Sequence, residues 1–143
     1  MSSTTTSLDS NVLVYLLNQD SLLNLRALAA IEQARRSGLL VVSGPVYAEL
    51  LGLPARTQAI LDEFFTIGGI QVDWRFDESA WRVAGVAFQG YVQRRLADTG
   101  LLPRRIVTDF LIGAHALVGG YALLTTDSSH YAAAFPELRI IAV

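Results

Sequence analysis

Short, wholly apolar runs alternate along this chain with segments of helical periodicity, and this alternation limits the fold more than any other feature. The clearest runs occupy residues 39–42 and 121–124. They are too short for typical helices, and they contain no polar residue that could face solvent on one side of a strand. Such runs are typical of strands that are buried on both faces of a parallel sheet. We therefore predict an α/β fold with a mostly parallel central sheet flanked by helices on both sides.

The predicted strands and helices cover most of the chain. Strands are expected over 5–8, 39–42, 70–73, 121–124 and 138–143. Helices are expected from residue 10, over 20–36, 44–53, 55–65, 77–97 and 104–118, with a short turn or helix from 127. In the second helix, Leu25, Leu28 and Ile31 are expected to form the buried stripe.

Composition narrows the class of protein further. The chain has 143 residues, of which 52% are hydrophobic and 17% charged, so we expect one ordered domain over residues 1–143. There is no cysteine and there are only two histidines, which excludes disulfides and Cys-based zinc sites and argues against imidazole-built metal centres. No apolar run is long enough to span a membrane, and the first residues show no signal-peptide core, so a cytoplasmic protein is expected.

Four acids interrupt apolar surroundings and are the best candidates for a functional site. Asp9 follows the first strand, Glu49 lies among apolar residues of a helix, Asp109 lies in the helix over 104–118, and Asp127 follows the strand over 121–124. Each has an ordinary structural explanation, since Asp9 and Asp127 can cap helices and Glu49 can lie on a solvated rim. Four such explanations together are less probable than one shared role, because acids are rarely buried without a partner.

If the four carboxylates converge at the carboxyl edge of the sheet, their charges repel one another and a divalent cation is the natural counter-ion. Oxygen ligands without cysteine or clustered histidine favour Mg²⁺ or Mn²⁺. We therefore predict that Asp9, Glu49 and Asp109 lie within reach of one ion.

The acids belong to stretches that resemble the motifs of a known family, the PIN-domain ribonucleases, specifically the VapC-type toxins of bacterial toxin–antitoxin pairs. The resemblance covers essentially the whole chain and rests on four motifs in the family's order. These are Leu8-Asp9-Ser10-Asn11, Val46-Tyr47-Ala48-Glu49-Leu50, the stretch from Thr108 to Ala116, and the stretch from Leu123 to Tyr131. Two departures are Gly113, where the family usually has alanine, and His130, where many relatives have a further aspartate. We expect Gly113 to be a harmless reduction in size.

The resemblance implies a Mg²⁺- or Mn²⁺-dependent endoribonuclease, with a homodimeric state and an antitoxin partner that blocks the site. It implies that Asp9, Glu49, Asp109 and Asp127 hold the ion and are catalytic, and that Asn11 and Thr125 orient these acids or the bound water. Three further residues are candidate RNA contacts: Arg104, Arg105 and His130.

Two other functions fit the residues less well. A PIN-like module that binds RNA or protein without cutting would not need to keep its acids. A phosphatase-like hydrolase with Asp9 as nucleophile would require a second aspartate at position 11 and a lysine elsewhere, whereas this chain has Asn11 and no lysine. The buried environment of His115 indicates a packing role.

Overall fold

The computed structural model describes residues 3–101, 105 and 107–143. Its five strands are β1 (Thr6–Leu8), β2 (Leu40–Ser43), β3 (Ile70–Asp73), β4 (Ala122–Thr125) and β5 (Ile140–Ala142). The helices within the described residues are α1 (Ser10–Leu17), α2 (Asn24–Ser37), α3 (Gly44–Leu51), α4 (Gln58–Gly68), α5 (Glu78–Thr99), α6 (Val107–Gly119) and α7 (Ser128–Ala134).

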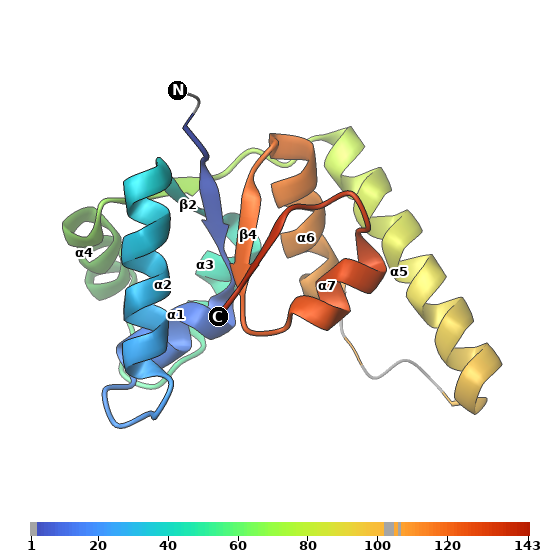
Figure 1. Cartoon of the computed structure of the whole chain (residues 1–143), viewed down its shortest axis with the longest axis horizontal. Helices are drawn as coiled ribbons and strands as arrows, with labels where there is room; N and C mark the ends of the chain where they lie inside the picture. Colours follow the sequence, from blue (N-terminus) through green and yellow to red (C-terminus); the bar gives the residue numbers. More distant parts are fainter. Residues whose placement is uncertain (1–2, 102–104, 106) are drawn as a thin grey trace.

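The strands form one all-parallel sheet in the order β3-β2-β1-β4-β5, which confirms the predicted fold class. Every residue of β1, β2 and β4 is buried, whereas β3 is buried only at its first residue. Helices flank the sheet, and Figure 1 shows α2 and α5 at opposite sides of the molecule with β1 and β4 between them. The chain runs outward from β1 to β3 and then returns to β4 on the other side of β1. This reversal creates a topological switch point at the carboxyl ends of β1 and β4, where sheets of this kind bind ligands.

The prediction for the second helix is wrong in two respects. The helix begins at Asn24 rather than at residue 20, because residues 18–23 form turns and the Asn24 side chain donates to the carbonyls of Tyr15 and Leu16 at 3.0 Å. Its buried stripe consists of Ala27, Ile31 and Ala34, whereas Leu25 is 76% exposed and Leu28 is 42% exposed. Small residues allow the helix to approach the core closely, and the larger leucines face outward.

The prediction for the helix over 104–118 falls partly outside the described residues. In the described part, this helix begins at Val107 and ends at Gly119. It is the most buried helix of the fold, with an uninterrupted buried stretch from Ile112 to Ala116. This packing places Asp109 in the first turn, close to the carboxyl edge of the sheet.

The small size of Gly113 is required by the packing of this fold, and the space that it leaves is filled. A Cβ atom at Gly113 would overlap the ring of Phe135, which follows α7 and is 3% exposed. The Phe135 ring therefore fills the space that an alanine would need. No local pattern indicates this contact, because the two residues are 22 positions apart.

Candidate functional site

The four predicted acids lie on elements that meet near the switch point. Asp9 is the N-cap of α1 directly after β1, and Asp127 precedes α7 directly after β4. Glu49 lies in α3, the helix that follows β2, and Asp109 lies in the first turn of α6. Two of the acids thus come from strand ends, and two come from helices that pack together.

Asp9 is the most buried of the four, at 3% exposure. Its Oδ1 accepts from the Ser10 backbone N–H at 2.8 Å, and its Oδ2 accepts from the Thr125 hydroxyl at 2.7 Å. The simpler N-cap role predicted for Asp9 is therefore real, but it uses only one of the two oxygens. Burial raises the pKa of Asp9 above its ordinary value, although these hydrogen bonds oppose the rise, and the nearby charge of Asp109 adds to it.

Glu49 lies on the same side of the sheet as Asp9, because the Ser10 hydroxyl donates to Glu49 Oε1 at 3.2 Å. Ser10 thus contacts both acids, one through its backbone and one through its side chain. Glu49 is exposed, as its alternative place on a solvated rim predicts. Partial removal of water still raises its pKa, and the charges of Asp109 and Asp9 raise it further, against the Ser10 hydrogen bond. Three carboxylates from distant segments therefore lie close enough to repel one another.

Asp109 also belongs to a second set of contacts, with Asp127 and Arg105. Arg105 Nη1 lies 2.6 Å from Asp127 Oδ2 and 3.3 Å from Asp109 Oδ2, so one guanidinium nitrogen bridges the two acids. The Arg105 backbone N–H donates to the Tyr91 hydroxyl of α5 at 3.2 Å, which holds the residue beside the site. The structure therefore divides the predicted acids: Asp109 and Asp127 share Arg105, whereas the described contacts of Asp9 and Glu49 include no basic side chain.

The carboxylate oxygens of this site are chemically suited to bind a hard divalent ion, but their positions are only partly suited to it. Carboxylate oxygens that raise one another's pKa gain from a shared cation, and Asp9 and Glu49 receive neutral donors rather than a basic side chain in their hydrogen bonds. Yet within residues 3–101, 105 and 107–143, no three histidine, aspartate or glutamate side chains are placed to hold one ion directly. The predicted convergence is met only in part, and ion binding requires side chains to move.

The two residues predicted to orient the acids have different contacts. Thr125 donates to Asp9 and accepts from the Asp127 backbone N–H at 2.9 Å, so it connects two of the acids. The Asn11 Oδ1 instead accepts from the Thr126 backbone N–H at 3.3 Å. Asn11 therefore fixes the loop that carries Asp127, and the prediction that it orients Asp9 or a bound water remains a prediction.

The candidate RNA contacts are not equally placed. Arg104 lies outside the described residues, and Arg105 is 36% exposed in its ion pairs. His130 lies in the first turn of α7, with its side chain only 7% exposed and 4.0 Å from Asp109 Oδ2. Burial, and then the charge of Arg105, lower the pKa of His130, so its ring is neutral at pH 7. Contact of His130 with RNA would require the side chain to become accessible.

Sequence reasoning missed two residues of this site, Ser10 and Tyr131. Tyr131 is 1% exposed, and its hydroxyl is buried near Asp9 without a well-formed hydrogen bond. Burial and then the charge of Asp9 raise the Tyr131 pKa strongly, so the hydroxyl stays protonated and can donate. Both residues belong to the four motifs, but a motif alone does not show which of its side chains reach the acids.

A second acid-containing cluster lies apart from these residues, around Asp73 at the end of β3. Asp73 Oδ2 accepts from the Tyr121 hydroxyl at 2.7 Å, and Asp73 Oδ1 accepts from Arg75 Nε at 3.0 Å. His115 Nε2 lies 3.1 Å from the Asp73 carbonyl, and this side chain is buried, as predicted. Although burial opposes them, the Arg75 and Tyr121 hydrogen bonds lower the pKa of Asp73 to about 2. We refer to these four residues as the Asp73 cluster.

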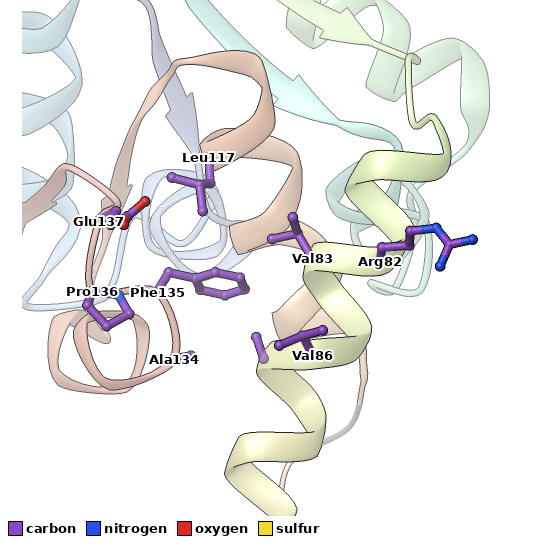
Figure 2. A pocket seen from close by; sticks show the side chains of 9 residues that line it. Arg82, Val83, Val86, Leu117, Ala134, Phe135, Pro136 and Glu137 are labelled. Atoms are coloured by element: carbon purple, nitrogen blue, oxygen red, sulfur yellow. The ribbon is translucent and has the colours of Figure 1, made fainter.

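An apolar pocket of about 410 Å³ lies between α5 and the segment that follows α7, and none of the four acids lines it. Figure 2 shows Val83 and Val86 of α5 facing Phe135 across this pocket, with Leu117 of α6 nearby. Its lining is mostly apolar and contains a single carboxylate, that of Glu137, so this pocket does not compete with the acids as a metal site.

No helix within the described residues is long and apolar enough to cross a membrane. Comparison with curated proteins gives no significant match.

Several solved structures share the fold. VapBC-1 from nontypeable Haemophilus influenzae is 20% identical, with a TM-score of 0.69 over 97% of this chain and 98% of the other. VapBC2 from Rickettsia felis, bound to a DNA fragment from its promoter, is 20% identical, with a TM-score of 0.66 over 97% and 98%.

A toxin-antitoxin complex from Klebsiella pneumoniae is 14% identical, with a TM-score of 0.67 over 96% of each chain. At these identities the likeness shows the shared fold. The sequence itself matches the PIN domain family over residues 7–136, which is nearly the whole chain. The chain therefore belongs to the PIN-domain family, a family of nucleases.

Proposed function

We propose that this protein is a Mg²⁺- or Mn²⁺-dependent endoribonuclease and the toxin of a toxin–antitoxin pair, with all of its residues in one domain. One observation carries the proposal: Asp9, Glu49 and Asp109 come from three distant segments, yet they lie close enough for the Asp109 charge to raise the pKa of both others. Repulsion among these three acids, of which only Asp109 contacts a basic side chain in the described residues, lowers the stability of the fold unless a cation joins them.

In this proposal Asp9, Glu49 and Asp109 hold the ion, and Asp127 does so after release from Arg105. When bound, a divalent ion activates water for attack on a phosphodiester and stabilises the charge that develops on the phosphate oxygens. Thr125 and the Ser10 backbone fix the two oxygens of Asp9, so this carboxylate is oriented before substrate arrives. The Ser10 hydroxyl does the same for Glu49.

The proposed partners follow from the likeness in fold to VapBC and toxin-antitoxin complexes. We propose a cognate antitoxin that covers the carboxylates, a homodimeric toxin, and a cytoplasmic site of action, where the RNA substrate is found. The alternative, a PIN-like module that binds RNA or protein with little catalysis, differs from this proposal in turnover and not in binding.

The test is cleavage of a structured RNA pool by purified protein freed of antitoxin, in Mg²⁺, Mn²⁺, Ca²⁺ or EDTA. We expect cleavage in Mg²⁺ or Mn²⁺, little in Ca²⁺ because of its looser coordination, and none in EDTA. Asp9→Asn should reduce the rate by about a thousandfold or more. The matched control Asp98→Asn, which changes an exposed acid at the end of α5, should cut like wild type.

Three results would contradict the proposal. Equal cleavage by wild type and Asp9→Asn would identify a contaminating nuclease. Full cleavage in EDTA would exclude a role for the ion. Binding of RNA by both proteins without cleavage in any ion would favour the binding module.

A further inference from the structure

Arg105 lies in a position that the proposed chemistry does not explain. Its Nη1 contacts Oδ2 of Asp127 at 2.6 Å and Oδ2 of Asp109 at 3.3 Å, so it takes up oxygens from two of the four acids. The three side chains are about equally accessible, at 36% exposure for Arg105, 31% for Asp127 and 28% for Asp109. The guanidinium is therefore neither a buried structural cation nor a fully solvated one.

The guanidinium and a divalent ion would compete for these carboxylate oxygens, so each would weaken the binding of the other. A positive charge within a few ångströms of a second cation weakens its binding, since the repulsion is only partly screened near a protein surface. Through Arg105, Asp109 is linked to Asp127, while its charge also raises the pKa of Asp9 and Glu49. With Arg105 in this place, no three acids of the described residues are placed to hold one ion.

We propose that Arg105 is an internal competitor of the divalent ion: it neutralises Asp109 and Asp127, and it must leave them when the ion binds. This inference rests on the proposed metal centre and adds a regulating residue to it. Arg105 lowers the ion affinity of the site and makes ion binding depend on the movement of one side chain. Once released from Asp109 and Asp127, the guanidinium would be available to an RNA phosphate, which its planar fork suits.

The inference predicts that loss of the Arg105 charge tightens ion binding, which is the opposite of the effect of removing a structural support. We expect Arg105→Gln to lower the Kd for Mn²⁺ at least about fivefold, measured by isothermal titration calorimetry. The matched control is Arg94→Gln on α5, because Arg94 is close enough to affect His130 but has no ion pair with Asp109 or Asp127 among the described contacts. Its Kd should stay within about twofold of wild type.

A second measurement uses the wild-type protein alone and does not depend on a variant. The NMR signal of the Arg105 Nε–H group, assigned by its loss in Arg105→Gln, should move toward the position of solvent-exposed arginines as Mg²⁺ is added. The signal of Arg82, an arginine of α5 paired with Glu78 at 2.8 Å, should not move.

Each outcome decides the inference. The proposed competition would be wrong if Arg105→Gln bound Mn²⁺ equally or more weakly, or if the Arg105 NMR signal did not move on addition of Mg²⁺. Neither result would contradict the metal centre itself. Wild-type protein that binds no Mn²⁺ would overturn both this inference and the proposed function.

Discussion

Asp9 and Asp73 occupy equivalent places in the sheet, at or just after the carboxyl end of a parallel strand, yet their surroundings differ completely. Burial, and then the charge of Asp109, raise the pKa of Asp9. Asp9 accepts hydrogen bonds from Thr125 and Ser10, but its charged neighbours are other acids. Asp73 has Arg75 and Tyr121 as donors, and its pKa is about 2.

This difference teaches how to separate functional from structural acids in such a fold. An acid that the protein neutralises itself, as in the Asp73 cluster, joins elements and needs no ligand. Acids that the protein brings together without a cation of their own, such as Asp9 and Glu49, lower the stability of the fold and are candidates for ligand binding. Position at a strand end does not distinguish the two cases, whereas the identity of the partner does.

The largest expected difference between the two kinds of acid is in RNA cleavage. Glu49→Gln should reduce metal-dependent RNA cleavage about a hundredfold or more, because it removes a carboxylate from the proposed ion site while Gln can still accept from Ser10. Asp73→Asn should cut within about twofold of wild type once the folded fraction is matched. Equal losses of cleavage in the two variants would show that the Asp73 cluster also belongs to the active site.

For the free energy of unfolding we expect the reverse order, with a larger effect at Asp73 than at Glu49. Asp73→Ala leaves the Tyr121 hydroxyl and Arg75 without their shared acceptor, so we expect a loss of about 1–2 kcal/mol in the free energy of unfolding. The exposed Arg75 pair contributes little of this. Glu49→Gln in EDTA should lie within about 0.5 kcal/mol of wild type or be slightly more stable. Urea unfolding checks both, and a larger loss for Glu49→Gln would assign Glu49 a structural role.

The smallest expected effect is the pH dependence of these differences. The folded pKa of Asp73 is lowered, so the stability it contributes is present above its unfolded pKa of about 3.9 and is lost as the pH falls toward 2. The folded pKa of Glu49 is raised, so wild type is penalised relative to Glu49→Gln at neutral pH, and the penalty disappears as the pH falls through the folded pKa.

Urea unfolding of wild type, Asp73→Asn and Glu49→Gln between pH 3 and pH 7 measures both trends. A gap between wild type and Asp73→Asn that widens on acidification would contradict the assignment of Asp73 as a neutralised acid.

The sequence predicted what depends on local pattern. The buried strands were recognisable because four apolar residues in a row cannot form a half-exposed strand, and β3 was predicted with its observed bounds. Asp9 and Glu49 were recognisable because each interrupts an apolar run. Such patterns involve only residues that are close in the chain, and they indicate which side chains are buried.

The remaining features depend on contacts between distant residues. Arg105 lies four residues before Asp109, a spacing that predicts a helical ion pair, but nothing local indicates that it also reaches Asp127, 22 residues away. The Asp73 cluster went unnoticed because Tyr121 is 48 residues from Asp73. The closeness of Asp9, Glu49 and Asp109 was predicted from topology, whereas their incomplete convergence follows from side-chain contacts that no spacing shows.

Direct measurement of Mn²⁺ binding tests the central claim most simply. Electron paramagnetic resonance reports free Mn²⁺ during titration of wild type, Asp9→Asn and Asp73→Asn, each confirmed as folded. We expect wild type and Asp73→Asn to bind Mn²⁺ with similar affinity, and Asp9→Asn to bind at least about tenfold more weakly, because only Asp9 belongs to the acids without a cation of their own. Undiminished binding by Asp9→Asn, or loss of binding by Asp73→Asn alone, would contradict the claim that Asp9, Glu49 and Asp109 form the metal centre.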